Sequence, residues 1–519
     1  MRALQRFGRR VPGLLVLVVI VAAISASSDS AAAQADPLPP VTGSTVDDVE
    51  RYLELRLSEA GRPGLAAAIV HNGEIVSTFE LGEASPGVPM TANTPLFIAS
   101  VSKSITAVAL MQQVEVGRVD LDDPVTVYLP ELAPEGELVT VRDLMHHRSG
   151  LTTYVGNEPW VGHLGSSLET NIERLGPLLE PDAPYTYSNA NYDALALIVQ
   201  RVSRTEFGDY VASHVFVPLG MGHSFVGPND GRQDVADGHY HWLGLGYRPF
   251  DQPTPRGLTG SATMYSTAED LAHFLIAHLQ DGLYDGHRVV AGGSIEQLHS
   301  PESLEIDLPA DYPVDVGYAG GLVADASFGP DIDENLAGLV TLVHTGGAFG
   351  YRSVIWMMPQ VDLGFVALTN GNNQADESWL PQVAQGVKYI LFGFDPPDIE
   401  VRSPFLLRYG KQLLLALVAV QTILVGLTIR AFRGDGRRWF NRAVIIAATI
   451  IDLAAFVLII WVIPTTGEAP LRVPLQLPDY RILILAMSAG VLWGIYRTYV
   501  VVKERGHAPT LVASSQPTS

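Results

Sequence analysis

Three long apolar segments near the C-terminus are the feature that most constrains this chain of 519 residues. They cover residues 413–429, 443–463 and 482–502, and each is close to the ~20 residues that a helix needs to cross a bilayer. The loop at 430–442 carries five arginines against one aspartate, so the positive-inside rule predicts that it is cytoplasmic. The first segment would then run from outside to inside. The large region before it is therefore expected outside the cytoplasm, in a multi-pass protein of the cell membrane.

The N-terminus predicts the same topology independently. Residues 1–35 resemble an export signal, with four early arginines, an apolar stretch at 11–24 and small residues before Asp36. An uncleaved N-terminal anchor is the alternative, and it also places the middle region outside. We therefore expect a signal peptide at 1–35, a globular domain at 36–394, a linker at 395–411, three transmembrane helices within 412–505 and a cytoplasmic tail at 506–519.

Charge and cysteine content exclude several classes of function. Residues 36–400 hold 49 acidic and 16 basic side chains, a balance of 16 − 49 = −33. Such a region repels phosphate, so no nucleic-acid partner is expected. The chain has no cysteine, which rules out disulfides, thiolate metal sites and a cysteine nucleophile.

The pattern of the middle region predicts mixed α and β structure. Asn72-Gly73 between two β-rich runs, 64–70 and 74–81, is a hairpin signature. Apolar residues at helical spacing predict helices at 102–116, 191–202 and 378–392, and alternation predicts strands at 339–343, 352–358 and 363–369. Because strands occur at both ends of the region, we expect an α+β fold in which they share one antiparallel sheet.

Ser100-Val101-Ser102-Lys103 is the first motif that carries chemistry. Residues three apart share a helix face, so Lys103 would lie beside Ser100 at the start of the predicted helix. A serine hydroxyl needs a nearby base to become a nucleophile, and a partly buried lysine can serve because its pKa falls. No other lysine of the chain follows a serine at this spacing. A solvated helix start is the alternative interpretation of this motif.

Two further motifs contain residues that suit the same chemistry. Tyr187-Ser188-Asn189 supplies a phenol, which is a base only where a cation such as Lys103 lowers its pKa, and an amide able to hold both Lys103 and substrate. In His344-Thr345-Gly346-Gly347, glycines at a strand edge would admit a substrate backbone, and the Gly347 amide could join that of Ser100 in an oxyanion hole. Alone, each is compatible with ordinary turn structure.

In their order, 87 and then 157 residues apart, the motifs resemble those of the serine β-lactamase and penicillin-binding-protein superfamily. The resemblance is closest to its class C β-lactamase and D,D-carboxypeptidase branch. It implies an α+β, β-lactamase-like fold, with an antiparallel sheet of about five strands between helices and a mostly helical lobe beside it. It also implies catalytic Ser100, Lys103 and Tyr187, with Asn189, His344, Thr345, Gly346 and Gly347 binding substrate.

His344 is a departure, because the third motif of this superfamily usually begins with lysine. A histidine is mostly neutral at pH 7, so it lacks the fixed charge that attracts a substrate carboxylate, and only its imidazolium at low pH would replace that charge. Arg352 is an alternative carboxylate-binding residue. We expect a serine hydrolase acting through an acyl-enzyme on Ser100, on an ester or amide substrate (peptide, D-aminoacyl or cell-wall-related), with weak or no β-lactamase activity.

Two other functions compete with this expectation. A binding module acylated by a penicillin-like ligand would deacylate slowly, and little cytoplasmic sequence is available to receive a signal from it. A zinc hydrolase would need ligands such as His146-His147 or His239-Tyr240-His241, but no ordered acidic ligand accompanies either pair. We expect no metal and no cofactor, a small-molecule or peptide substrate, and the membrane as partner through the C-terminal helices. The sequence leaves the oligomeric state open.

Overall fold

The computed structural model describes residues 41–505, apart from gaps at 163, 230–231, 233, 304–315, 326–335, 337–338, 373–376, 400–404, 433–445, 452–453 and 455–477. The expected signal peptide, most of the second apolar segment and the expected tail lie outside the described residues.

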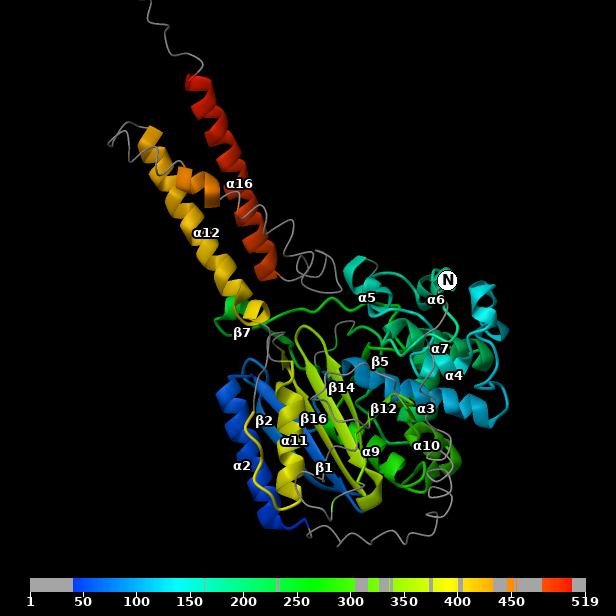
Figure 1. Cartoon of the computed structure of the whole chain (residues 1–519). Helices are drawn as coiled ribbons and strands as arrows, with labels where there is room; N and C mark the ends of the chain where they lie inside the picture. The colour runs from blue at the N-terminus through cyan, green and yellow to red at the C-terminus, as the bar shows by residue number, and fades with distance from the viewer. Residues whose placement is uncertain are drawn as a thin grey trace, which may run out of the picture.

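One antiparallel sheet organises the globular domain, as predicted (Figure 1). Its central strands come from both ends of the domain, because β1 pairs with β2 on one side and with β16 on the other. Within the described residues the sheet has nine strands, more than the expected five, since short strands extend both edges. In spatial order these are β11 (Glu302–Ser303), β12 (Val316–Ala319), β13 (Leu322–Asp325), β14 (Thr341–Gly347), β15 (Arg352–Met358), β16 (Leu363–Thr369), β1 (Gly64–His71), β2 (Glu74–Ser85) and β3 (Val88–Pro89).

The predicted hairpin between β1 and β2 is confirmed. Asn72 and Gly73 both have positive φ, 54° and 74°, which is the backbone that a two-residue turn matching the strand twist requires. Asparagine and glycine tolerate this conformation best, so these two residues fix the register of the hairpin.

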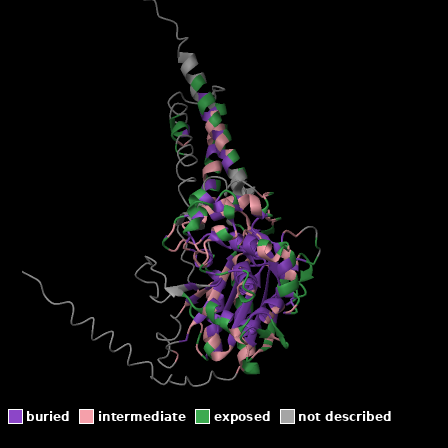
Figure 2. Ribbon diagram, turned by 90° about the vertical axis from the view of Figure 1, so that its right-hand side faces the viewer, coloured by how far each residue is buried: buried purple, intermediate pink, exposed green. Residues whose placement is uncertain are grey.

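Helices cover both faces of the sheet and form a lobe beside it (Figures 1 and 2). On one face α2 (Gly43–Ala60) and α11 (Trp379–Leu391) pack over a core that includes Leu53, Trp356 and Phe365. On the other face α9 (Ala268–Leu279) packs against β16 and β1. Fully burying each such side chain contributes about 1.5–3 kcal/mol, so this packing fixes the sheet between its helices.

The helical lobe is built around α3 (Ser102–Glu115) and α7 (Asn189–Ser203), which pack against each other. Both helices occur where the apolar spacing predicted them. The site described below lies where the start of each helix meets the end of β14.

Two long helices, α12 (Phe405–Phe432) and α16 (Pro478–Arg505), extend side by side from the domain (Figure 1). Among the described residues one helical stretch, Lys411–Arg430, is long and apolar enough to cross a membrane. The apolar part of α16 is shorter, Ile484–Arg497. Helix α12 begins inside the expected linker, because the leucine-rich sequence from Phe405 already favours a helix.

Candidate active site

Ser100 lies in a single 3-10 turn, Ala99–Val101, between β4 (Leu96–Phe97) and α3, and therefore precedes the first residue of the helix by two positions. The preceding residue, Ala99, has φ 47°, a conformation that residues with a side chain seldom adopt. The Ser102 hydroxyl donates to the Ala99 carbonyl at 2.6 Å, and the Ser353 hydroxyl donates to the Ile98 carbonyl at 2.7 Å. These bonds hold a strained turn that presents Ser100 to the cavity.

Lys103 is fully buried directly behind Ser100. Its Nζ lies 3.2 Å from Ser100 Oγ, 2.7 Å from Asn189 Oδ1 and 2.8 Å from the Ser261 carbonyl oxygen. The structure therefore brings the first two motifs together, as the resemblance to the superfamily implied. Ser261 was not predicted as a partner of Lys103.

The three contacts of Lys103 fit two protonation states. An ammonium donates to all three oxygens, whereas a neutral amine donates to Asn189 and Ser261 and turns its lone pair toward the Ser100 hydroxyl. Burial lowers the pKa of Lys103, because an ammonium loses its hydration inside the protein. The geometry thus suits a lysine that takes a proton from serine.

Asp193 is a buried carboxyl that sequence reasoning missed. Its oxygens accept from the Ser261 amide at 3.0 Å and the Ser261 hydroxyl at 3.1 Å, which fixes the carbonyl that Lys103 contacts. Burial raises the pKa of Asp193, and the Lys103 charge opposes that shift. The sequence offered one feature that could have identified Asp193: it lies four residues after Asn189 on α7, and residues four apart share a helix face.

Tyr187 lies beside Ser100 and Lys103, but the pKa of its phenol shifts in the direction opposite to the prediction. Lys103 Nζ is 4.8 Å from its ring centroid, and Tyr187 lines the same cavity as Ser100. The prediction that a cation would lower the pKa of Tyr187 is wrong: burial raises the pKa of this phenol well above 10, so it is protonated at neutral pH.

The third motif forms one wall of the same cavity. Strand β13 pairs with β14 only up to Val343, so the residues from His344 to Gly347 are paired on one side, with β15. This leaves a strand edge beside Ser100, as predicted. His344, Thr345 and Gly347 line the cavity.

Gly346 has a different role from the one expected. A Cβ placed there would lie 2.1 Å from the Ile98 carbonyl oxygen and 2.2 Å from Ser353 Oγ. The glycine therefore lets β14 approach the turn that carries Ser100, whereas it was expected to admit a substrate backbone.

We expect Gly346→Ala to destabilise the domain by about 1–3 kcal/mol, because the added methyl group overpacks against backbone that cannot move alone. Gly347→Ala is the matched control, since its Cβ would meet the movable end of the Arg352 side chain. Urea unfolding of both variants measures the difference. Equal stability losses would contradict this role for Gly346.

His344 is a neutral residue in this structure. Its Nδ1 lies 2.9 Å from the Thr345 carbonyl oxygen and therefore donates to it, which leaves Nε2 to accept from the Tyr318 hydroxyl at 3.4 Å. Burial, assisted by the nearby Lys103 charge, lowers the pKa of His344 to about 3. The expectation that its imidazolium attracts carboxylates at mildly acidic pH is therefore wrong.

The lowered pKa of His344 makes stability depend on pH. In unfolded chains histidine titrates near 6.5, so between that value and 3 the unfolded state binds a proton that the folded state excludes. The contribution of neutral His344 to the free energy of unfolding is fully present above pH ~6.5 and is lost as pH falls toward 3. From about pH 7 to about pH 5 the wild type should lose roughly 2 kcal/mol more than His344→Gln. Urea unfolding at both pH values measures this, and identical losses would contradict the burial of a neutral His344.

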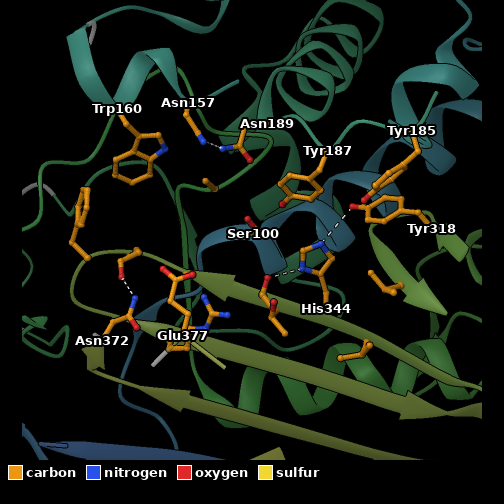
Figure 3. A pocket seen from close by; sticks show the side chains of 18 residues that line it. Ser100, Asn157, Trp160, Tyr185, Tyr187, Asn189, Tyr318, His344, Asn372 and Glu377 are labelled. Atoms are coloured by element: carbon orange, nitrogen blue, oxygen red, sulfur yellow. Dashed lines mark hydrogen bonds between the residues drawn. The ribbon is translucent and has the colours of Figure 1, made fainter. Parts of the chain in front are cut away.

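The cavity in front of Ser100 has a volume of about 620 Å³ (Figure 3). Its wall is largely aromatic, with Trp160, Tyr185, Tyr318 and Phe349 around Ser100. Asn157 accepts a bond from Asn189 Nδ2 at 2.9 Å and extends the polar side. Sequence reasoning missed these residues because they come from separate parts of the chain that carry no motif: a helix at Thr153–Gly162 for Asn157 and Trp160, strand β12 for Tyr318, and loops for Tyr185 and Phe349.

Arg352 and Glu377 also line the cavity and give it both signs of charge. Arg352 pairs with Gly347 across β14 and β15. The alternative carboxylate-binding residue named from the sequence is thus placed in the site.

The histidines considered as zinc ligands bind protein groups instead. His146 Nδ1 contacts the Tyr318 carbonyl at 2.9 Å, and His147 Nδ1 accepts from Asn191 Nδ2 at the same distance. Among the described residues no three His, Cys, Asp or Glu side chains come close enough to hold a metal ion.

Comparison with known proteins places this site in context. The family model described as Beta-lactamase matches residues 48–388. Protein flp of Staphylococcus aureus (strain MW2) is 26% identical over 347 residues, which are 64% of this chain and 65% of that protein. The match thus spans slightly less than two thirds of this relative's length.

Solved structures agree on the fold. The octameric penicillin-binding protein homologue from Pyrococcus abyssi has a TM-score of 0.58 and 26% identity, covering 71% of this chain and 81% of that one. The D-amino acid amidase from Ochrobactrum anthropi SV3, solved with L-phenylalanine amide, has a TM-score of 0.57 and 22% identity, covering 67% and 98%. The predicted β-lactamase-like α+β fold is confirmed.

Proposed function

This chain belongs to the beta-lactamase family of serine hydrolases, and on that premise we propose that it hydrolyses esters or amides through an acyl-enzyme on Ser100 while anchored to a membrane. The observation that carries the proposal is the position of Lys103, buried 3.2 Å behind Ser100 and held by Asn189 and Ser261. A buried amine in that place has one evident use, as the base for the hydroxyl.

In the first step, neutral Lys103 takes the Ser100 proton as Oγ attacks the substrate carbonyl carbon. The amides of Ser100 and Gly347 would hold the oxygen that becomes negative, each contributing roughly 3 kcal/mol. Tyr187, a phenol at neutral pH, would give its proton to the leaving alcohol or amine as the carbon–leaving-group bond breaks.

In the second step, water attacks the acyl-enzyme and the ester bond to Ser100 breaks. Before this step Lys103 would pass the Ser100 proton to the Tyr187 phenolate, which restores both the phenol and the neutral amine. Lys103 would then accept the proton of the water and give it to Ser100 Oγ as the ester bond breaks. Thr345 and Asn189 would orient the substrate from opposite sides of the cavity.

The charge distribution favours a substrate that is not a typical β-lactam. With His344 neutral, Arg352 is the cation available on the β14 side of the cavity for a carboxylate. The aromatic wall suits a peptide, D-aminoacyl or cell-wall-related group with apolar parts. Weak β-lactamase activity follows, because the fixed charge of the usual lysine is absent.

Membrane anchoring is supported by the surface of the C-terminal helices. Ile423, Leu492 and Ile495 are each more than 60% exposed, which is costly in water and favourable in lipid. Figure 2 shows exposed segments along the long helices that extend from the domain. By the positive-inside rule, the arginines at 430–442 support a catalytic domain outside the cytoplasm.

A fluorophosphonate probe tests the nucleophile. The full chain should gain the mass of one adduct, and Ser100→Ala should abolish it. Ser213→Ala is the matched control, because the Ser213 hydroxyl donates to the Asp209 carbonyl at 2.7 Å outside the cavity, so this variant should still be labelled. Labelling of Ser100→Ala to the wild-type extent would overturn the assignment.

A further inference from the structure

A short hairpin connects the catalytic cavity to the helix of membrane-spanning length. Its strands are β6 (His239–His241) and β7 (Tyr247–Pro249). Strand β6 pairs with β17 (Gly371–Asn372), where Asn372 faces Tyr240, and Asn372 lines the cavity. The Asn372–Tyr240 pair therefore joins the cavity wall directly to the hairpin.

The other side of the hairpin contacts the start of the apolar helix. Lys411 Nζ lies 3.9 Å from the Tyr240 ring centroid and 3.1 Å from the His241 carbonyl oxygen. Lys411 is also the first residue of the membrane-length stretch Lys411–Arg430. Figure 1 shows β7 at this end of α12. The membrane entry point and the cavity therefore lie at the same end of the domain.

The tip of the hairpin has the composition of a membrane interface. Leu245 is 77% exposed, and Trp242 is half-buried beside it. Leu243 packs against the cluster of Leu414 and Met487 on the two long helices. Tryptophan and tyrosine favour the headgroup region, and an exposed leucine gains free energy when it enters lipid.

Aromatic rings continue from the hairpin into the cavity. Phe250, directly after β7, lies 6.3 Å from the ring centroid of Phe349, and Phe349 lies 6.4 Å from Trp160. Both Phe349 and Trp160 line the cavity in front of Ser100. An apolar chain could follow this surface from the hairpin tip to the nucleophile.

We propose that the β6–β7 tip lies in the outer leaflet of the bilayer and that the substrate is an amphiphilic ester or amide presented by the lipid surface. The inference rests on the proposed function, since it assigns the source of the substrate of that same site. The surface is expected to be zwitterionic, because residues 36–400, with a charge balance of −33, are repelled by anionic lipids.

Fluorescent labelling tests the position of the tip. The chain lacks cysteine, so Leu245→Cys in the full chain can carry a single environment-sensitive fluorophore. Val116→Cys is the matched control, because Val116 is 62% exposed and lies at the end of α3 far from Ser100, about 20 Å along the helix. In phosphatidylcholine vesicles the label at 245 should shift to shorter wavelength and be quenched by nitroxide lipids, and the label at 116 should not. A label at 245 that reports water, like that at 116, would overturn the inference.

Two fluorophosphonates, one ethyl and one hexadecyl, test delivery from the lipid. In each case Ser100 Oγ bonds to phosphorus and fluoride leaves. In vesicles the hexadecyl probe should react roughly tenfold faster or more, and Leu245→Asp should reduce this ratio several-fold while Val116→Asp does not. Reaction of the ethyl probe without faster reaction of the hexadecyl probe contradicts the inference and leaves the proposed function intact. If neither probe labels Ser100, the proposed function fails, and the Leu245 label still decides where the tip lies.

Discussion

Lys103→Ala is expected to slow acylation of Ser100 by about two to four orders of magnitude, the usual effect of losing a general base. Lys103 Nζ is 3.2 Å from Ser100 Oγ, and no other amine among the described residues contacts that hydroxyl. In the wild type, acylation should speed up as pH rises through the pKa of Lys103, because the neutral amine is the active form. Stopped-flow acylation by an activated ester measures both effects.

Lys388→Ala is the matched control for this variant. Lys388 is also a buried lysine, and burial lowers its pKa to about 8, but its Nζ donates to Thr341 Oγ1 outside the cavity. Both variants remove a buried amine, and only Lys103→Ala should slow acylation. A Lys103→Ala variant that acylates within a few-fold of Lys388→Ala would show that another group takes the proton.

Tyr187→Phe should lower turnover by about two to four orders of magnitude, because it removes a proton donor while keeping the ring. The ring lies 4.6 Å from that of His147, so packing in the variant is preserved. The loss should be greatest for amides with poor leaving groups, since these need protonation most. Turnover of an amide and of an activated ester, compared in one variant, measures this.

Tyr210→Phe serves as the control for Tyr187→Phe. In the wild type the Tyr210 hydroxyl donates to Gln112 Oε1 at 2.9 Å within the helical lobe, away from the cavity. The Tyr210→Phe variant should turn over both the amide and the ester at the wild-type rate. An equal loss on ester and amide in Tyr187→Phe would contradict the role of proton donor.

The fold was predictable because the patterns that determine it are local. The turn at Asn72-Gly73, the apolar spacing of α3 and α7, and the alternating strands β15 and β16 each depend on a few neighbouring residues. The short edge strands were missed, since two-residue strands such as β11 leave no period in a sequence.

The candidate site was predictable only in part. The motifs identified Ser100, Lys103 and Asn189 because their order along the chain resembles that of a known superfamily, and the structure brings the three together. Asp193 and Ser261 were not identified, since the contact of Ser261 with Lys103 and that of Asp193 with Ser261 depend on tertiary packing. The pKa directions of Tyr187 and His344 were wrong or unforeseen for the same reason, because burial is a property of the folded chain.

Trapping the acyl-enzyme tests the central claim most directly. The full chain is mixed with an activated ester, quenched in acid within the first turnover, digested and mapped by mass spectrometry. The acyl group should reside on the peptide that contains Ser100, and it should be absent in Ser100→Ala. Normal product release with no acyl group on that peptide, or with the group on another residue, would contradict the account.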